Sequence, residues 1–321
     1  MNKKEFLREL SFRLIFMKKD DKQAILDYYS EMIDDYVEDG YTEEEAVLKL
    51  GSIKSIIKNI KESKDNEDSI EYIEKKLEFK SEGITNISLT ALNRKIKIEK
   101  SNDELIHLEY NESEKDYINI EIIDNKLNIE NVVEKQNGIN FIINKIIDTT
   151  IILYIPESFI YDLYICTKNS AIISECELNL TNGSFITTNG TLNIQDISST
   201  NDLLFTTTNG AIKLSKISAE NINIKSTNGA IKLEKIDSKE QLNISTTNGS
   251  VNFDNIISSK EIKIKTTNGS IKGTIGEEQS TYSIESHTVN GRNNLSNIVL
   301  DSDKKLIVET ANGSINIQFK E

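Results

Sequence analysis

Residues that could carry out acid–base or metal chemistry are few and scattered in this chain of 321 residues. The chain has two histidines, His107 and His287, which are far apart and lie in no recognisable catalytic motif. Cys166 and Cys176 lack the spacing of a zinc site or a disulfide framework, so we interpret them as unrelated thiols in a reducing compartment. A nucleotide-binding glycine loop and the HExxH and GxSxG motifs are absent. We therefore expect no catalysis, no cofactor and no metal.

The composition excludes several classes of protein. A net charge of −14, shared between residues 1–79 and the remainder, argues against nucleic-acid binding, which requires a basic surface. The charged residues Glu9, Arg13 and Lys18 interrupt the N-terminus, so we do not expect it to be a signal peptide. No segment approaches the ~20 apolar residues that a membrane helix needs. We expect a soluble cytoplasmic protein, with association to a membrane through a partner as the alternative.

The residues that do recur at regular spacing belong to a repeat. An Asn-Gly pair returns every 19–22 residues after residue 160, with Asn169-Ser170 as a degenerate first copy and Asn290-Gly291 as the penultimate copy. A fixed period near 20 residues predicts a solenoid. The pairs expected to form the structural turns are Asn189-Gly190, Asn209-Gly210, Asn228-Gly229, Asn248-Gly249, Asn268-Gly269 and Asn312-Gly313.

Positions counted from each asparagine fix the strands of this repeat. Apolar residues occupy positions −6, −4, +3, +5 and +8, as in Leu203, Phe205, Ile212, Leu214 and Ile217 around Asn209. Alternation with period two predicts two strands with one face turned inward. Position −2 is always Thr or Ser, which we expect to point inward at a narrow corner. Glycine would permit a positive φ at the corner, and stacked asparagines could bond to one another.

The outward positions of the repeat offer three possible functions. Lysines such as Lys213 and Lys232 would form ranks that could bind a polyanion or a cell-wall polymer, although lysines also keep a β-surface soluble. Positions +4 and −3 hold no clustered carboxylates, which a polysaccharide-cleaving enzyme would need. A rank of threonines suggests ice binding, but Lys225 and Lys265 break the second rank that a flat ice-binding face requires.

The first sixty residues have the period of helices rather than strands. Four short helices are expected, and Asp20 or Asp21 would cap the second, Gly40 would end it, and Thr42 would begin the third with a capping box. The apolar positions that predict the first two helices are Phe6, Leu7, Leu10, Leu14, Ile15, Ile25, Leu26, Tyr29, Ile33, Tyr36 and Val37. The charged residues 63–79 are expected to be a linker or a short coupling helix.

Tyrosines of the second helix and the following turn are the candidate contacts for a protein partner. Tyr28 and Tyr41 are expected to lie off the apolar stripe, and Tyr36 and Gly40 lie near them in the sequence. Exposed tyrosines are enriched where proteins meet, although these could instead pack against the linker or the first repeat. The acidic residues between Asp27 and Asp39 are expected to be a solvated face or a contact for a basic partner.

Phe6 to about Ile60 resembles a known helical domain. The segments FLREL, ILDYYSEMIDDYVEDGYTEEEAVLKLG and IKSIIKNI are similar to the DUF1700 or HAAS domain. The resemblance implies a role in bacterial signalling, often beside PadR-type regulators and before membrane spans. This sequence departs from the family pattern at Ile53, where proline is common, and in having no following span.

The remainder of the chain resembles a second family. The run Ile151 to Pro156 and the TTNGxIxL repeats after it are similar to the DUF4097 "putative adhesin" family over about Gly83 to Phe319. That resemblance implies a single-stranded β-helix. Residues 80–160 alternate as strands without Asn-Gly corners and are expected to form irregular first coils, with an insertion of unknown role at residues 137–150.

Together these observations predict an α+β multidomain protein. Residues 1–62 would form a small helical bundle and residues 80–321 a long single-stranded β-solenoid of ~20-residue coils. We expect a non-enzymatic binding or scaffold protein in bacterial signalling, with a protein partner on the helical module. The alternative is a surface-associated adhesin that binds a polymer or another cell-envelope ligand.

Overall fold

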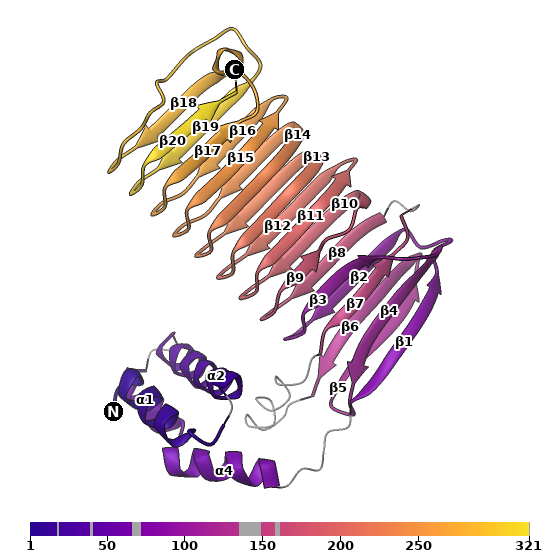
Figure 1. Ribbon diagram of the computed structural model, residues 1–321, viewed down its shortest axis with the longest axis vertical. Helices are drawn as coiled ribbons and strands as arrows, with labels where there is room; N and C mark the ends of the chain where they lie inside the picture. Colours follow the sequence, from indigo (N-terminus) through magenta and orange to yellow (C-terminus); the bar gives the residue numbers. More distant parts are fainter. Residues whose placement is uncertain (18, 39–40, 66–71, 135–148, 158–160, 321) are drawn as a thin grey trace. The chain divides into compact units, whose positions relative to one another are not determined.

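A computed structural model describes residues 1–17, 19–38, 41–65, 72–134, 149–157 and 161–320. The chain divides into two units: one contains the α-helices up to Tyr72, and the other contains the strands from Ile73 onward (Figure 1). A small N-terminal helical region therefore precedes a large β-rich domain, as the sequence predicts.

The described residues of the helical unit form four helices: α1 (Lys3–Arg13), α2 (Lys19–Glu38), α3 (Glu43–Lys49) and α4 (Ile53–Asp65). The predicted capping box is confirmed, because the Thr42 side chain accepts from the backbone N–H of Glu45 while Glu45 bonds back to Thr42. Asn2 and Glu5 form a second capping box, at the start of α1. The predicted caps Asp20 and Asp21 are wrong, because α2 already begins at Lys19. Gly40 lies outside the described residues.

One apolar core joins the four helices. Its buried residues are Phe6, Leu10, Leu14, Ile25, Tyr29, Ile33, Ala46, Val47, Ile56 and Ile60. Two residues assigned to the inner stripe are exposed instead: Ile15 at 81% and Val37 at 40%. Ile15 departs from the prediction because α1 ends at Arg13, so the helical period no longer applies to it.

The strands of the β-rich unit fall into three stretches of the sequence. The first stretch holds β1 (Ile73–Lys80), β2 (Asn86–Ala91), β3 (Ile96–Lys100), β4 (Leu105–Glu112), β5 (Asp116–Ile123), β6 (Lys126–Val133) and β7 (Ile151–Ile155). The second holds β8 (Tyr161–Thr167), β9 (Ile172–Ser174), β10 (Leu178–Thr187), β11 (Leu192–Ser199), β12 (Asp202–Thr207), β13 (Ile212–Ser226) and β14 (Ile231–Ser245). The third holds β15 (Val251–Ser258), β16 (Glu261–Lys265), β17 (Ile271–Ile275), β18 (Ser283–Thr288), β19 (Lys305–Thr310) and β20 (Ile315–Phe319), with a short 3-10 helix, η1 (Gln279–Thr281), before β18.

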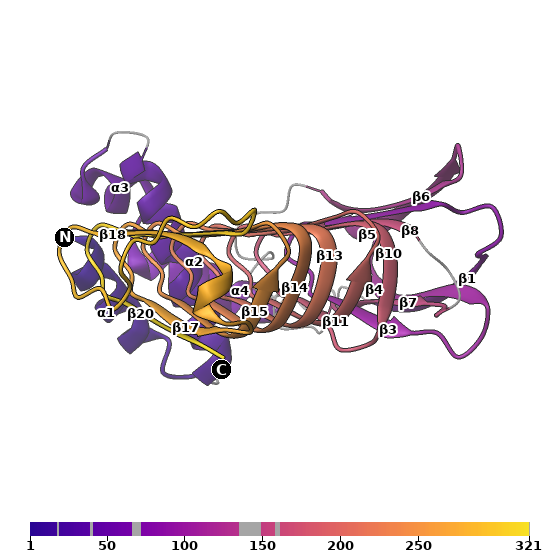
Figure 2. The same ribbon diagram turned by 90° about the horizontal axis from the view of Figure 1, so that it is seen from above.

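Strands of successive repeats pair in parallel, each with the strand about one repeat away. Ile212 lies beside Ile231, Ile231 beside Val251, and Val251 beside Ile271, so identical positions of neighbouring repeats are stacked. Figure 2 shows the paired strands as two layers in the view from above. The buried apolar side chains of both layers form one core. The inward assignment is confirmed, since Phe205, for example, is fully buried.

The predicted linker at residues 63–79 is partly wrong. Helix α4 continues to Asp65, and Ile73–Lys80 form strand β1, which pairs antiparallel with β4. Alternation of Ile73, Leu77 and Phe79 with charged residues is the period of a strand, and the many charges hid it. The β-rich unit therefore begins at Ile73 rather than at residue 80. The insertion predicted at residues 137–150 lies almost entirely outside the described residues.

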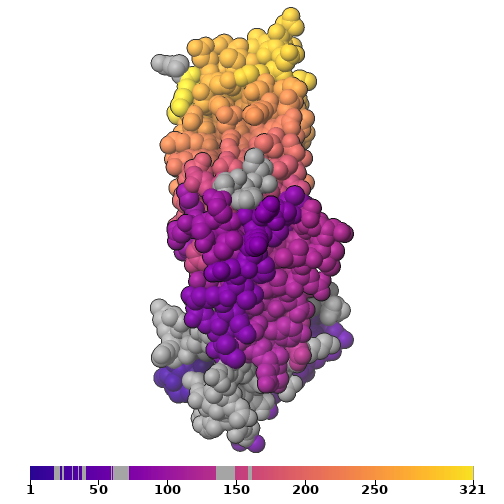
Figure 3. All heavy atoms as spheres, turned by 90° about the vertical axis from the view of Figure 1, so that its right-hand side faces the viewer, coloured from indigo at the N-terminus to yellow at the C-terminus, as the bar shows by residue number. Residues whose placement is uncertain are grey.

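Neither end of the β-rich unit follows the regular repeat. At the N-terminal end, β1–β4–β7 and β5–β6 are antiparallel pairings, so the prediction of further coils there is only partly right. Figure 3 shows these strands in purple and magenta, with the orange and yellow repeats above them. The β5–β6 hairpin turns at Asp124 and Asn125, which both have positive φ, instead of at an Asn-Gly corner.

Both ends also contain a repeat that is out of chain order. Strand β2 lies between β6 and β8, and strand β3 lies between β7 and β9, although β2 and β3 precede all four neighbours in the sequence. At the other end, β19 lies between β16 and β18. Strands of the first and last repeats thus lie inside the stack rather than at its edge: β2 and β3 at the N-terminal end, and β19 at the C-terminal end.

Candidate functional site

The Asn-Gly corners form one continuous ladder. Each asparagine donates a side-chain hydrogen bond to the side-chain oxygen of the asparagine before it in space, with nitrogen–oxygen distances of 2.6–2.8 Å. The ladder runs in space through Asn290, Asn312, Asn268, Asn248, Asn228, Asn209, Asn189, Asn169 and Asn93. The predicted structural role of these asparagines is thus explained by side-chain hydrogen bonds between neighbouring repeats.

The glycines of these corners are required for close backbone packing and not for a positive φ. Positive φ values occur in the described glycines only at Gly51 and Gly83, so the predicted left-handed corner glycine is wrong. A Cβ on Gly210 would lie 1.7 Å from the backbone oxygen of Gly190, and one on Gly229 would lie 1.7 Å from the oxygen of Gly210. Glycine is required there because adjacent backbones approach closely.

The left-handed residues lie seven positions after the asparagine. Asp196, Lys216, Lys235 and Asn255 have φ values of 54–57° and turn the chain at a second corner. This corner has no visible sequence motif, because its four positions hold Asp, Lys, Lys and Asn. Lys216 also pairs with Asp196 at 3.0 Å, which links neighbouring repeats.

The small residue at position −2 closes each corner with its hydroxyl group. Thr207 Oγ1 accepts from the backbone N–H of Gly210 and donates to the carbonyl oxygen of Gly190 in the preceding repeat. Thr246 does the same with Gly249 and Gly229. The expectation that these residues point inward is confirmed by their burial.

The outward lysines do not form a continuous basic surface. Lys213 lies beside Lys232, but Asn252 follows Lys232 in that rank. Lys265 forms an ion pair with Glu309 at 2.5 Å. A polyanion would therefore meet only short basic segments, which favours the solubilising role of the lysines.

The candidate tyrosines are divided between the core and the surface of the helical unit. Tyr28 is half-buried and lies edge-on to Tyr29, with ring centroids 5.2 Å apart, and burial raises its pKa. Tyr36 and Tyr41 pack edge-on at 6.2 Å, and the Lys49 Nζ lies 3.9 Å from the Tyr41 ring centroid. Tyr41 is 40% exposed, so it is the candidate with the most accessible ring.

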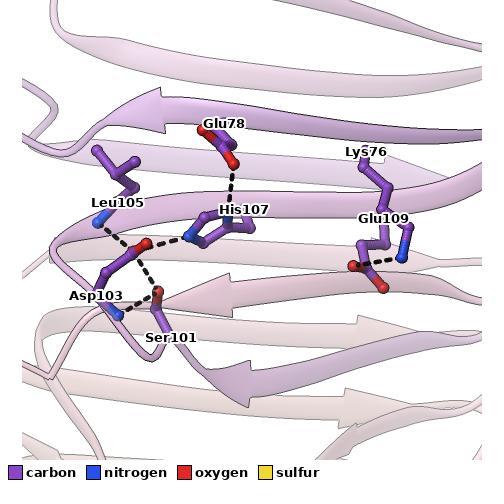
Figure 4. Close-up of polar contacts among 7 residues, drawn as sticks. All are labelled: Lys76, Glu78, Ser101, Asp103, Leu105, His107 and Glu109. Atoms are coloured by element: carbon purple, nitrogen blue, oxygen red, sulfur yellow. Dashed lines mark hydrogen bonds and ion pairs between the residues drawn. The ribbon is translucent and has the colours of Figure 1, made fainter.

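A histidine with two carboxylates lies on the outer side of β1 and β4 (Figure 4). His107 Nε2 is 2.8 Å from Asp103 Oδ1, and this contact holds the pKa of Asp103 below its usual value; Nδ1 is 3.7 Å from Glu78. The Ser101 hydroxyl donates to Asp103 and not to the histidine. In a Ser-His-carboxylate triad the serine donates to the histidine, so these three side chains are not arranged as such a triad.

A buried ion pair stabilises the N-terminal end. Arg94, 1% exposed, contacts Asp116 at 2.7 Å and donates to the carbonyl oxygen of Asn111 at 2.6 Å. Asn131 also donates to Asp116, at 2.7 Å. Arg94 follows Asn93, the last asparagine of the ladder, and so replaces the corner glycine in this repeat.

A shallow cleft of about 520 Å³ lies on the outer face of β2, β8, β10, β12 and β13, where these strands run side by side. The lining residues are Asn86, Asp162, Leu163, Tyr164, Asn182, Gly183, Ser184, Asp202, Leu203, Leu204, Asn223 and Lys225. The cleft therefore lies between the regular repeats and the first irregular strands. It is the candidate functional site of the β-rich unit.

Two rows of side chains run along this cleft. In the first row, Asp162 accepts from the Asn182 side chain at 2.8 Å, and Asp202 accepts from the Asn221 side chain at 2.9 Å. In the second row, the small Ser184 lies between Tyr164 and the larger Leu204. The cleft thus combines fixed polar groups with a hollow between two larger side chains.

Apart from Lys225, the cleft residues lie outside the outward positions +4 and −3, where a catalytic or binding face was considered, so their place in a site was not predicted. The carboxylates Asp162 and Asp202 occupy position −7, where the asparagine spacing also places Asn182. An outward tyrosine followed one repeat later by an outward serine was the available signal. The residues that the structure describes contain neither a cluster of three or more potential metal ligands nor a helix long and apolar enough to span a membrane.

Comparison with solved structures gives distant similarities. A "putative cell adhesion protein" from Clostridium sporogenes ATCC 15579 is 14% identical, covering 78% of this chain and 100% of that chain, with a TM-score of 0.27. A "putative adhesin" from Bacteroides fragilis NCTC 9343 is 13% identical over 77% and 98% of the two chains, with a TM-score of 0.41. A "putative adhesin" from Parabacteroides distasonis ATCC 8503 is 12% identical over 78% and 98%, with a TM-score of 0.36. No curated protein matches the sequence.

Two family models match the two units. Residues 5–59 match the HAAS family, in agreement with the resemblance of the helical segment. Residues 84–319, more than half of the chain, match the model described as Toastrack DUF4097. The chain belongs to the Toastrack DUF4097 family.

Proposed function

We propose that this protein is a non-enzymatic binding scaffold with two contact surfaces. The β-rich unit would be a single-stranded β-solenoid that presents a rigid surface, and the helical unit would be a bundle that contacts a protein partner. The observation that carries the proposal is the cleft formed by side chains of neighbouring, hydrogen-bonded strands.

Rigidity of the stack supports a binding role. The asparagine ladder and the in-register backbone bonds hold each repeat against the next. A surface that is already ordered loses little conformational freedom when a ligand binds, which improves affinity. The cleft would therefore bind a ligand without first having to fold.

The helical unit offers a smaller surface around Tyr41. Its ring is accessible, stacks edge-on with Tyr36 and is covered on one side by the Lys49 ammonium group. Tyrosines held in place in this way are frequent at protein interfaces. The HAAS match adds the expectation of a signalling partner, which the family resemblance implies.

A cytoplasmic location remains our proposal, and a surface-associated adhesin is the second candidate. The cleft favours the second candidate in one respect, since its polar groups suit a polymer rather than an apolar metabolite. The adhesin hypothesis predicts that the ligand at the cleft is a cell-envelope polymer. The scaffold hypothesis predicts that the helical unit binds a protein.

A pull-down from native-host extract with the full chain tests the scaffold reading. We expect wild type to retain a protein partner and Tyr41→Ala to lose it, because the substitution removes the exposed ring. Lys54→Ala, also exposed on the helical unit, is the matched control and should retain the partner. Equal retention by Tyr41→Ala and wild type, with unchanged helical circular dichroism, would contradict the proposed protein contact.

A further inference from the structure

We propose that the cleft binds a saccharide, with one sugar ring seated over Ser184 between Tyr164 and Leu204. This inference rests on the proposed binding function and names the ligand class of the same site. It depends on three features of the described residues: the shape of the hollow, the origin of that shape in β10, and the pattern of polar groups along it.

The shape comes from one small residue between two large ones. Ser184 pairs with Tyr164 on one side and with Leu204 on the other. Adjacent strands are about 4.8 Å apart, so the backbones of Tyr164 and Leu204 are separated by roughly 10 Å. A ring lying on Ser184 would have an aromatic face on one side and an aliphatic side chain on the other.

Strand β10 is irregular where the hollow forms. Its register shifts between Leu180 and Asn182, which is a bulge, and Gly183 follows at an inward position that holds Leu203 in the next repeat. A Cβ on Gly183 would lie 2.6 Å from Leu203 Cδ2, so the Leu203 side chain occupies that space. Bulges and strand glycines are frequent beside ligand sites, where they redirect neighbouring side chains.

The polar row presents groups whose orientation is already fixed. Asn182 donates to Asp162 through its side-chain nitrogen and accepts from the Asp202 backbone N–H at 3.3 Å through its side-chain oxygen. Asp162 and Asp202 provide carboxylate acceptors along this row, while Ser184 and Lys225 line the cleft as donors. A sugar hydroxyl both donates and accepts, so it suits a row that mixes the two kinds of group.

Other ligand classes fit this cleft less well. Two carboxylates would repel a nucleic acid or another polyanion. A peptide cannot add as a strand, because both edges of β10 and β12 are already paired in the sheet. A wholly apolar ligand would remove Asp162 and Asp202 from water without replacing their hydrogen bonds.

Calorimetric titration of the full chain with cellohexaose and with chitohexaose tests the inference. We expect wild type to bind at least one of the two oligosaccharides, and Ser184→Leu to weaken that binding at least tenfold by filling the hollow. Tyr164→Ala should weaken it similarly, and Tyr164→Phe should preserve it because the ring remains. Asn243→Leu, in the same outward row but outside the cleft, is the matched control and should bind as wild type does.

Three results would overturn the inference. No binding of either oligosaccharide by wild type excludes the proposed ligand class, while a partner retained in the pull-down would leave the scaffold function intact. Binding that Ser184→Leu and Tyr164→Ala leave unchanged would place the sugar elsewhere. Weakening by Asn243→Leu equal to that by Ser184→Leu would show a general effect on the sheet. Cleavage of the bound oligosaccharide would instead support the ligand class and contradict the non-enzymatic function.

Discussion

The middle and the ends of the β-rich unit are both built from strands, but the strands differ in their order and pairing. In β10 to β17, repeats follow chain order, pair in parallel and place Asn and Gly at each corner. At the ends, β2 and β3 of the first repeat and β19 of the last lie inside the stack, and antiparallel strands or irregular loops cover the outside. A stack of identical repeats would expose strand edges, so its ends must be built differently.

The C-terminal end shows how such an edge is covered. Ile298 pairs with Ile284 of β18, and the Asn294 side chain bonds to both the backbone N–H and the carbonyl oxygen of Ile317 in β20. One loop therefore satisfies backbone groups in both layers. Periodicity therefore specifies the interior of this unit, whereas its ends depend on contacts between residues far apart in sequence.

Substitution of glycine should give the largest difference in stability loss between the middle and the end of the unit. We expect Gly210→Ala to cost more than about 4 kcal/mol, because the added Cβ would overlap the backbone oxygen of Gly190. Gly83→Ala, near the N-terminal end, meets open space and should cost only about 1–2 kcal/mol for its φ of 88°. Urea denaturation of both variants measures this. A smaller loss for Gly210→Ala than for Gly83→Ala would contradict the close-approach explanation.

The N-terminal end should depend on its buried ion pair. We expect Arg94→Ala to cost about 3–5 kcal/mol, because it leaves Asp116 buried without its charged partner. Replacing both residues with leucine should cost less than the single change, since no unpaired charge remains. Thermal and urea melts of the two variants test this. A double variant less stable than Arg94→Ala would show that the polar network itself is required.

The inward and outward positions of the middle repeats should differ clearly. We expect Ile231→Ala to cost about 2–5 kcal/mol, as for other large-to-small changes in a core, because Ile231 is fully buried. Lys232→Ala, next to it and exposed, should cost under about 0.5 kcal/mol. Urea melts that ranked Lys232→Ala as the more damaging change would be inconsistent with the observed alternation.

Much of the repeat could be predicted because its cause is local. Alternation at Ile212 and Leu214 follows from one buried face, and the Asn-Gly pairs mark each corner. Strand β1 was missed because charged side chains on its outer face resemble a linker. The insertion of β19 between β16 and β18 has no local signature at all, since the spacing of Asn268, Asn290 and Asn312 is the same in either order.

The cleft was harder to predict than the fold for a related reason. Each lining residue, such as Ser184 or Tyr164, is unremarkable within its own repeat. The hollow exists only because different outward residues are stacked across neighbouring strands, together with a bulge in β10. Small departures from a repeat are therefore where its function is best sought.

Hydrogen exchange of the full chain, followed by mass spectrometry, tests most directly whether the middle repeats form a preformed, rigid binding surface. The stacking predicts that backbone amides of β10, β12 and β13 beneath the cleft exchange slowly and together, while those of the edge strands β1 and β5 exchange faster. Exchange under the cleft as fast as in β1 and β5 would contradict the claim, because a locally opening sheet could not hold Tyr164 and Leu204 apart as a fixed site.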